Sequence, residues 1–472
     1  MSRNRLIVNA LIFVAAAGLL LGGCTMSPKY ERPAAPVPNA WPAGEAYGKV
    51  AAGEAKTPAE MKWEEFFTDA NLRQLVAMAL KNNRDLRLAA LNVEKARALY
   101  GIQRAELFPA ANAVGTGSKG RTPADLSYTR QETTYEQYGV NFGVSAWEID
   151  FFGRIRSLKD RALEEYFATD QARRSAQILL VSAVANAYLT LAADRESLKL
   201  TASTLEAQEH AYKLIKRRYE VGMASELDLR RAQSQVDTAR GDVARYTQMS
   251  AQDENALQLL VGSPVPAALL PPELGKLRPL RDISAGLSSE VLLNRPDIRA
   301  AEHRLRAANA NIGAARAAFF PRISLTTSFG TASADLSGLF RDGSSTWNFA
   351  PQIVMPIFDA RLWSLYDATK VEKEITIAQY ERAIQTAFRE TADALAVQGT
   401  VNRQIEAQKS LVDAFAETYR LSGMRYQKGI DSYLSVLDAQ RSLYGAQKAL
   451  ISLQLFRLTN DIALYKALGG GA

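Results

Sequence analysis

Side chains that commonly do chemistry are scarce in this chain. Its 472 residues include two histidines, His210 and His303, and one cysteine, Cys24. Neither histidine has a cysteine or an acidic cluster at metal-site spacing, and both lie in strongly helical segments, where we expect surface positions. The chain also lacks a glycine-rich phosphate loop and a Gly-x-Ser-x-Gly nucleophile motif. The sequence therefore predicts a protein that is not an enzyme and holds no metal and no cofactor.

Cys24 follows a segment with the features of an export signal. Two arginines precede an apolar run over residues 6–21, which covers about 24 Å as a helix and is short for a membrane span. The run ends in Leu-Gly-Gly-Cys, which resembles a bacterial lipoprotein box. Cleavage would leave Cys24 carrying covalent lipid, and Thr25 after it favours the outer membrane. The alternative is an uncleaved signal with an incidental cysteine.

Arginine, tyrosine and aspartate gather at two copies of one motif. Arg-Tyr-x-x-Gly occurs at 218–222 and at 425–429, each time between two long helical stretches. Glycine adopts the left-handed C-cap at little cost, so each copy predicts the tip of a helical hairpin. We expect Ser225 to cap the first returning helix, and Asp431 or Ser432 to cap the second.

These tips belong to a duplication that spans most of the chain. The segments 82–87 and 104–109 match 294–299 and 316–321, both at an offset of 212 residues. Each half reads helix, strand, loop, strand, long helix, tip and returning helix. The predicted divisions are a signal peptide (1–23), a proline-rich, lipid-anchored extended segment (24–66), a first repeat (67–284) and a second repeat (285–472).

Two stretches with alternating side chains predict strands. Over 138–146 and again over 323–330, apolar side chains alternate with small or polar ones. A soluble sheet over a core shows the same alternation, but the small polar face and the length of about ten residues suit a membrane barrel strand. Trp147 and Trp347 lie near strand ends, where an aromatic girdle would sit. Residues 110–118 form a further, weakly patterned strand.

Four strands per chain cannot close a barrel, and lipid does not tolerate open sheet edges. Three copies would supply twelve strands.

The helices also indicate a large assembly. Helical stretches are predicted over 69–106, 152–219 and 289–318, and the second would be about 100 Å long. A seven-residue repeat with one strong apolar residue per heptad predicts coiled-coil packing of many helices around a cylinder. In the long helix, this repeat falls on Val184, Leu191, Leu198, Leu205, Tyr212 and Tyr219.

Taken together, these features resemble the bacterial outer-membrane factors of the TolC and OprM type, and most closely the OprM-like lipoproteins of multidrug efflux pumps. The specific marks are Leu-Phe-Pro at 107–109, Ala-Trp-Glu-Ile-Asp-Phe-Phe-Gly-Arg at 146–154, Ala-Ala-Arg-Ala-Ala-Phe-Phe-Pro at 314–321 and Leu-Asp-Ala-Gln-Arg-Ser-Leu at 437–443.

The resemblance implies a homotrimer that forms a twelve-stranded membrane β-barrel and a long α-helical coiled-coil barrel. The implied function is the passive exit duct of a tripartite efflux pump. Its implied partners are outer-membrane lipid, a periplasmic adaptor protein and an inner-membrane transporter of the RND type.

The resemblance also implies a gate at the tips. Asp438 matches a ring aspartate, and Leu434 matches an apolar constriction one turn earlier. Tyr426 matches a tyrosine that hydrogen-bonds across hairpins to an aspartate, here Asp228. The chain departs from some members at Asp431, where they have an arginine, and at Ser435, where they have a second ring aspartate.

Because of this departure, we expect Asp431 and Asp228 to pair with tip arginines such as Arg218, Arg425 or Arg231. The adaptor is expected to dock at Gly222, Met223, Ala224, Ser225, Gly429 and Ile430.

Two other functions stay open on the sequence alone. One is a duct for type I protein secretion, and the other is a lipid-anchored periplasmic coiled-coil scaffold without a pore. A nucleic-acid surface is disfavoured, because the formal net charge is only +7 and the basic residues are interspersed with acidic ones.

Overall fold

The computed structural model describes residues 25–47, 61–278, 280–281, 283 and 288–471. The predicted signal peptide and Cys24 lie outside these residues. The chain divides into two compact units, and both halves of the sequence contribute to each. One unit takes residues from 1–33, 93–169 and 301–380, and the other from 34–92, 170–300 and 381–472.

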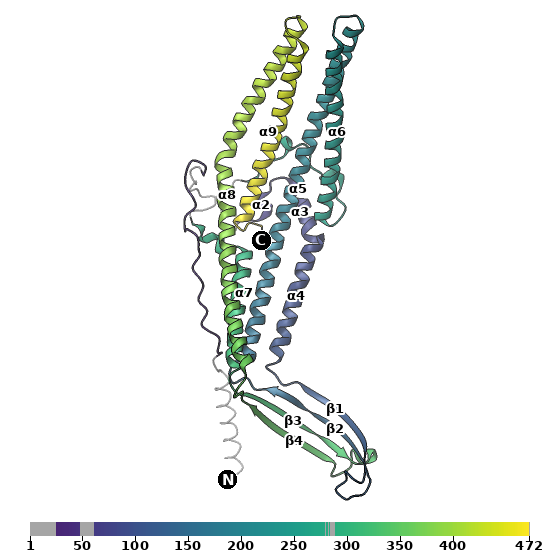
Figure 1. The fold of residues 1–472 in the computed structure, drawn as a ribbon, viewed down its shortest axis with the longest axis vertical. Coiled ribbons are helices and arrows are strands. Elements are labelled where there is room, and N and C mark those ends of the chain that lie inside the picture. The colour runs from purple at the N-terminus through teal and green to yellow at the C-terminus, as the bar shows by residue number, and fades with distance from the viewer. Residues whose placement is uncertain (1–24, 48–60, 279, 282, 284–287, 472) are drawn as a thin grey trace. The chain divides into compact units, whose positions relative to one another are not determined.

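Long helices and four strands make up most of the described chain (Figure 1). This confirms the predicted fold class at the level of one chain. The elements are α2 (Trp63–Phe66), α3 (Ala70–Asn82), α4 (Arg84–Ala105), β1 (Ala111–Thr122), β2 (Thr133–Glu148), α5 (Arg154–Glu220), α6 (Glu226–Val261), η2 (Ala267–Leu269), η3 (Leu274–Lys276), η4 (Ser289–Asn294), α7 (Pro296–Ala317), β3 (Arg322–Ser333), η5 (Leu336–Gly338), β4 (Ser345–Val354), α8 (Ala360–Gln427) and α9 (Tyr433–Ala467).

The first unit contains a four-stranded antiparallel sheet in the order β1-β2-β3-β4. Phe142 pairs with Phe329, which in turn pairs with Trp347, so these three side chains share one face. The partner face carries small and polar side chains such as Asn141 and Ser328, because side chains alternate along a strand. The predicted alternation is therefore confirmed, and β1 and β4 are the two edges.

A bulge in β2 changes one detail of this pattern. Two residues, Ser145 and Ala146, stand opposite Thr326 alone, and Ala146 has a φ of 51°. Its backbone N–H donates to Thr326 Oγ1 at 3.0 Å. The alternation predicted that Ala146 would continue the apolar face. It does not, because the extra residue shifts the alternation of side chains by one position. This shift places Trp147 opposite Leu325, on the apolar face.

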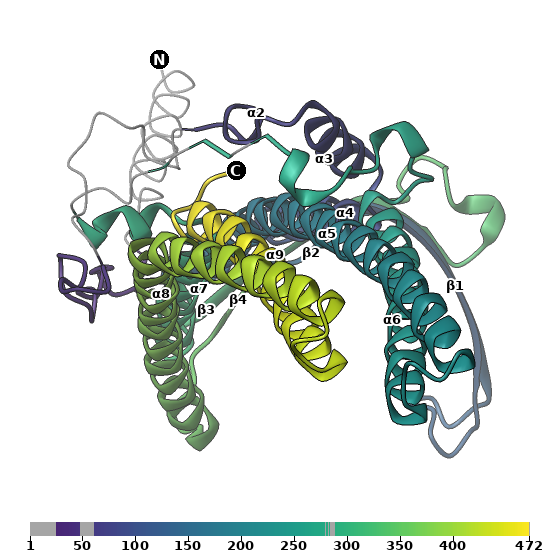
Figure 2. The same cartoon turned by 90° about the horizontal axis from the view of Figure 1, so that it is seen from above.

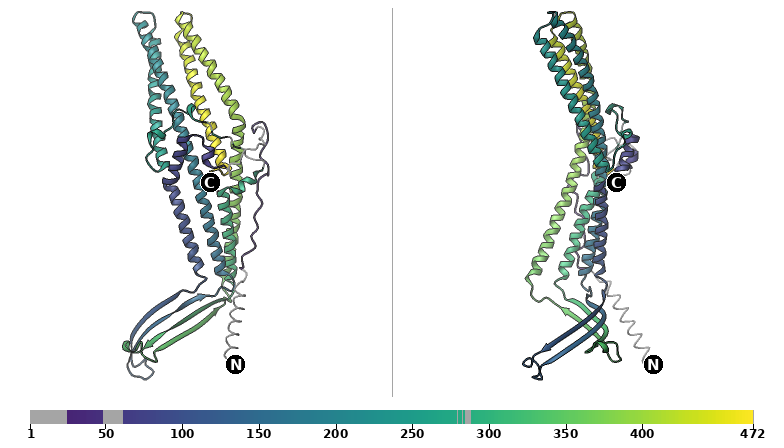
Figure 3. Two further views of the ribbon diagram at one scale, coloured as in Figure 1. Left: turned by 180° about the vertical axis from the view of Figure 1, so that it is seen from behind. Right: turned by 90° about the vertical axis from the view of Figure 1, so that its right-hand side faces the viewer.

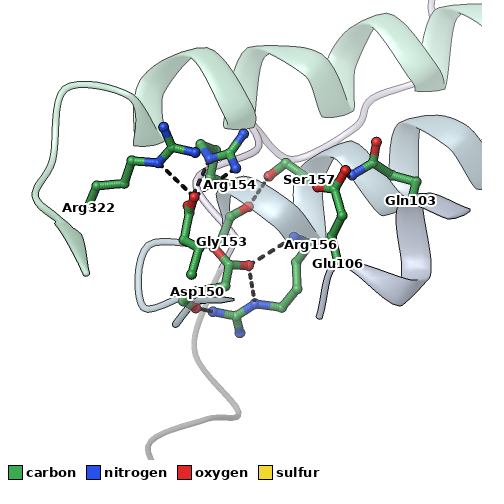
Figure 4. Close-up of polar contacts among 9 residues, drawn as sticks. Gln103, Glu106, Asp150, Gly153, Arg154, Arg156, Ser157 and Arg322 are labelled. Atoms are coloured by element: carbon green, nitrogen blue, oxygen red, sulfur yellow. Dashed lines mark hydrogen bonds and ion pairs between the residues drawn. The ribbon is translucent and has the colours of Figure 1, made fainter. Parts of the chain in front are cut away.

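Ion pairs fix the end of β2 to the start of α5. Glu148 accepts two hydrogen bonds from Arg154, both at 2.8 Å, and one from Arg322 at 2.7 Å. Asp150 accepts from the backbone N–H of Arg156 at 2.9 Å and pairs with its guanidinium (Figure 4). The contacts with Arg154 and Arg156 explain the charged residues of the 146–154 motif, because they tie the end of β2 and the residues after it to the first turn of α5.

Within the segment predicted as extended over 24–66, residues 25–33 form neither helix nor strand and bind along the same unit, whereas Trp63–Phe66 form the short helix α2. Asn309 donates its side-chain N–H to the Pro28 carbonyl at 2.8 Å. Arg32 contacts both carboxylate oxygens of Glu302, which is only 5 % exposed. Arg306 also donates to Glu302, at 2.8 Å. A buried carboxylate with two guanidinium partners is a specific anchor for this segment.

In the second unit, the stretch predicted over 69–106 as one helix is two helices, α3 and α4. Asn83 between them is extended, with a ψ of 133°. Its side chain accepts from the Leu86 N–H at 2.9 Å and donates to the Leu260 carbonyl at 2.9 Å. The break forms because this asparagine caps the second helix and is held by α6.

The predicted stretch over 289–318 is likewise divided, into η4 and α7. Arg295 is extended between them, and Pro296 occupies the first helical position of α7.

Two helical hairpins, α5–α6 and α8–α9, dominate the second unit (Figure 2). Val184 and Leu191 of α5 are fully buried, as the predicted heptad requires. Further along α5, Leu198 and Leu205 are only half-buried within one chain, and Tyr219 is 40 % exposed. The buried stripe there runs through Thr201, Gln208 and Ile215. Two of these three are polar, so a pattern of hydrophobicity could not find them.

Candidate gate at the helical tips

The two hairpin tips lie at the same end of the second unit (Figure 3). Gly222 and Gly429 have φ values of 76° and 73°, which confirms the predicted left-handed caps. The N–H of Met223 donates to the Arg218 carbonyl at 2.7 Å, and the N–H of Ile430 donates to the Arg425 carbonyl at 2.9 Å. Both turns therefore have the same hydrogen-bond geometry.

The helices that return from the tips begin differently. Ser225 caps α6 as predicted, because its hydroxyl oxygen accepts from the Asp228 N–H at 3.1 Å. The capping predicted for the second tip is wrong: Ser432 precedes α9 but makes no side-chain capping bond. Asp431 is engaged elsewhere, since Arg425 donates to its two oxygens at 2.6 and 3.0 Å.

The Arg425–Asp431 ion pair is the one that the sequence predicted for this tip. It links the last turn of α8 to the turn before α9. Its hydrogen bonds from Arg425 hold the pKa of Asp431 below its ordinary value. The two side chains are 54 % and 27 % exposed, so water and salt screen their attraction.

The partners predicted for Asp228 are wrong within the described part of one chain. Its carboxylate accepts from the Ser225 hydroxyl at 2.7 Å, and neither Tyr426 nor an arginine bonds to it. Ser225 and Asp228 satisfy each other because they occupy the N-cap and N3 positions of one helix. Arg218 lies over the ring of Tyr426 instead, with its guanidinium carbon 5.1 Å from the ring centre.

An apolar group that we name the tip cluster packs beneath both turns and joins all four hairpin helices. Its buried members are Ile215, Ala232, Tyr433, Val436 and Leu437, and Tyr212, Ala224, Leu229, Tyr419 and Tyr426 pack against them.

Tyr433 is one of the buried members that the sequence reasoning missed. It is 5 % exposed, and its hydroxyl has no hydrogen-bond partner among the described residues. Burial, followed by Tyr419, Tyr426 and Asp228, raises its pKa. The sequence does contain an indication of this position, because Tyr433 continues the seven-residue spacing of Tyr419 and Tyr426.

The predicted constriction residues lie outside this cluster. Leu434 is 40 % exposed, and Asp438, one turn further along α9, is also exposed. Their neighbours Val436 and Leu437 point into the cluster. One face of α9 therefore holds the hairpins together, and the other presents an apolar and then an acidic side chain.

The predicted docking residues are mostly on the surface. Met223 and Ile430 are 68 % and 59 % exposed, whereas Ala224 packs against the tip cluster. Gly222, Ser225 and Gly429 are exposed as well. Two exposed apolar residues of the first tip, Val221 and Leu227, were not predicted. Exposed apolar side chains at a chain reversal are typical of a surface that contacts another protein.

The two histidines differ in their surroundings. His210 is exposed on α5. His303 is half-buried, its Nδ1 lies 2.6 Å from a Glu164 carboxylate oxygen, and its ring packs against Phe167. His303 is therefore not the free surface residue that we expected. Within residues that the structure describes, no group of three or more His, Cys, Asp or Glu side chains is arranged to hold a metal ion.

The sheet is the best candidate for the membrane-crossing part. Phe142, Phe329 and Trp347 on its apolar face are 62 %, 67 % and 79 % exposed within one chain. Helix α5 also contains a window apolar enough to cross a bilayer, but 61 % of that window is buried inside the protein.

Comparison with known proteins gives consistent results. The family model described as outer membrane efflux protein matches residues 75–263 and 287–470. The probable efflux pump outer membrane protein TtgC of Pseudomonas putida is 50 % identical over 463 residues, covering 98 % of this chain and 96 % of the relative. Outer membrane protein OprJ of Pseudomonas aeruginosa is 45 % identical over 456 residues, covering 96 % and 94 %.

Among solved structures, the open state of the MtrE outer membrane channel of Neisseria gonorrhoeae superimposes with a TM-score of 0.85 at 38 % identity. The match covers 95 % of this chain and 98 % of that channel. With relatives of this identity matched over nearly their full length, the chain belongs to the outer membrane efflux protein family.

Proposed function

We propose that three copies of this chain form a channel across the outer membrane and serve as the passive exit duct of a tripartite pump for antibiotics and other toxic compounds. The observation that supports it best is the sheet, which has one apolar face, one small and polar face, and unpaired edges at β1 and β4. Such a sheet is stable in lipid only when its edges are paired. Pairing β1 of one copy with β4 of the next closes a ring of twelve strands.

In this ring, the apolar face contacts lipid and the polar face lines the channel. Trp147 lies near the end of β2 that leads into α5, and Trp347 lies near the opposite end of the sheet, beside the β3–β4 loop. The two tryptophans are therefore positioned for the two membrane interfaces, where aromatic side chains are favoured.

In the proposed channel, the hairpin tips form the gate. Three copies of Leu434 narrow the pore and exclude water, and three copies of Asp438 repel one another and attract cations. The Arg425–Asp431 pair holds the turn before α9 and thereby sets the position of both residues.

The exposed apolar residues at the tips bind the partner. A periplasmic adaptor docks over Met223 and Ile430, with Gly222, Ser225 and Gly429 providing close approach of the backbone. Through the adaptor, the duct connects to an inner-membrane transporter of the RND type, which selects the compounds.

Covalent lipid on Cys24 anchors the chain to the outer membrane. The described segment that follows is held on α7 through Asn309 and Glu302, so an anchor at Cys24 would be attached to a fixed part of the protein. Mass spectrometry of the mature N-terminal peptide, compared with that of a Cys24→Ser variant, tests this modification.

Deletion of the gene tests the function. We expect the deletion strain to become severalfold more sensitive to hydrophobic antibiotics, and the wild-type gene, but not a copy with an early stop codon, to restore resistance. The purified protein should form channels in a planar bilayer. Unchanged sensitivity together with loss of an exported protein would indicate secretion instead, and a purified trimer without conductance would indicate a scaffold.

Single-channel recording tests the gate. Arg425→Gln and Asp431→Asn should each raise the resting conductance, because either change removes the ion pair. The exchange variant Arg425→Asp/Asp431→Arg should return conductance toward the wild-type value. If neither single variant changes conductance, the ion pair has no part in gating.

A further inference from the structure

A second set of contacts between the hairpins lies deeper than the tip cluster. Tyr444 on α9 faces Thr201 on α5 and Asp242 on α6. It is eleven residues beyond the start of α9 at Tyr433, which is about 16 Å along a helix. None of these three residues takes part in the tip ion pair or in the tip cluster.

The chemistry of the three groups assigns their roles. Tyr444 has one hydroxyl proton, and a carboxylate can only accept, so Tyr444 donates to Asp242 Oδ2 at 2.9 Å. Thr201 Oγ1 lies 2.9 Å from the Tyr444 oxygen and donates either to it or to the Ser197 carbonyl at 2.7 Å. The other Asp242 oxygen pairs with Arg245 at 3.1 Å. Arg245 on the same helix therefore holds one oxygen of Asp242, and the other oxygen accepts the hydrogen bond from Tyr444 on α9.

A cation between two rings strengthens the same junction. Lys448, one turn after Tyr444, has its ammonium nitrogen 5.2 Å from the Tyr444 ring centre and 5.3 Å from that of Tyr246 on α6. Tyr246 is 8 % exposed, so this contact is shielded from water. Burial and the Asp242 carboxylate help to raise the pKa of Tyr444 to about 12, so its hydroxyl keeps its proton under physiological conditions.

A polar cavity of about 260 Å³ adjoins this junction. Gln208 and Gln440 on its wall are 5 % and 9 % exposed, and Gln208 Oε1 has no partner among the described residues. Here the hairpins meet through polar groups, in contrast to the apolar tip cluster. When polar groups separate, they can form hydrogen bonds to water instead. Separating the hairpins at Tyr444 therefore costs less free energy than separating them at the apolar tip cluster.

We propose that Tyr444, Asp242 and Thr201 form a latch that holds α9 against α5 and α6 and keeps the resting channel narrow. The latch acts independently of the Arg425–Asp431 pair, because it joins two hairpins, whereas that pair lies within one. Tyr444 and Asp242 are positioning residues, because they act by setting where α9 carries Leu434 and Asp438. The proposal rests on the proposed function as a gated channel.

The test compares Tyr444→Phe with Tyr246→Phe in planar bilayers. Tyr444→Phe removes the hydroxyl that bonds to Asp242 and keeps the ring that contacts Lys448. We expect its open probability to rise about tenfold, the factor for loss of a hydrogen bond to a charged group. Tyr246→Phe is the matched control, because no hydrogen bond to its hydroxyl is present in the described chain, and it should behave as wild type.

A double-mutant cycle separates the latch from a general loss of packing. Asp242→Asn should raise the open probability less when Tyr444 is already phenylalanine, whereas Arg425→Gln should add its full effect to Tyr444→Phe. Trimer recovery and melting temperature identify any variant that fails to assemble. A wild-type open probability in Tyr444→Phe, or full additivity with Asp242→Asn, would overturn the latch. If the wild-type protein forms no channels, the proposed function itself fails.

Discussion

Two acidic side chains between α5 and α6 show how a single residue can set the pH dependence of this protein. Asp194 on α5 and Asp253 on α6 each keep one buried carboxylate oxygen without a partner among the described residues. Burial, and then the adjacent Asp194 carboxyl, raise the pKa of Asp253 to about 6. Near neutral pH the folded protein therefore holds a carboxylate that would ionise more readily in the unfolded chain.

The sign of this effect follows from linkage. A carboxyl with a raised pKa in the folded state favours folding fully below its unfolded pKa of about 4, and this contribution is lost as the pH rises through about 6. We expect Asp253→Asn to raise the melting temperature of the detergent-solubilised protein by roughly 2 °C at pH 7.5 and to have little effect at pH 4.

Asp413→Asn is the control for this experiment, because Asp413 is exposed on α8. It should leave the melting temperature unchanged at both pH values. A lower melting temperature for Asp253→Asn at pH 7.5 would mean that the ionised Asp253 carboxylate stabilises the fold. The cost of burying its charge would then be smaller than the interactions it makes.

At the scale of elements, the tip turns can be tested separately from the helices they join. Gly429 has a φ of 73°, and a Cβ added there would meet no atom within 4 Å, so Gly429→Ala is opposed only by backbone strain. We expect a cost of about 1 kcal/mol, seen as faster amide hydrogen exchange at the second tip.

Gly423, six residues earlier, provides the matched variant. It lies inside α8, and a Cβ there also meets nothing within 4 Å, so Gly423→Ala should stabilise the helix by roughly 0.5–1 kcal/mol. Equal exchange rates in the two variants would contradict a left-handed cap at Gly429.

The elements also show what a sequence can predict. The glycine turns at both tips, the Ser225 cap and the alternating strands follow from local rules about glycine, capping side chains and period, and the structure agrees with them. The bulge at Ala146, the helix break at Asn83 and the stripe through Thr201 and Gln208 depend on partners distant in sequence. Of the proposed gate, the Arg425–Asp431 pair could be predicted because its members are six residues apart. Tyr444 and Asp242 could not, because 202 residues separate them.

At the scale of the whole molecule, the two faces of the sheet can be distinguished by neighbouring substitutions. Phe349 lies on the apolar face opposite Thr327, and Asn348 lies on the polar face opposite Ser328. We expect Phe349→Arg to cost about 2–4 kcal/mol in lipid and to reduce the amount of trimer recovered from outer membranes.

Asn348→Arg should assemble normally and change only the ion selectivity of the channel. Equal recovery of both variants, measured by SDS-resistant trimer on gels, would mean that the two faces have been assigned wrongly.

The unpaired edges of the sheet have a genetic consequence. In the proposed ring, every subunit offers β1 to one neighbour and β4 to the other, so a single copy with a blocked edge leaves the ring open. When normal and edge-blocked copies are made in equal amounts and mix freely, only about one assembly in eight contains normal subunits alone. An allele with proline in β1 should therefore be dominant over the wild-type gene, whereas an allele that destroys the fold should be recessive.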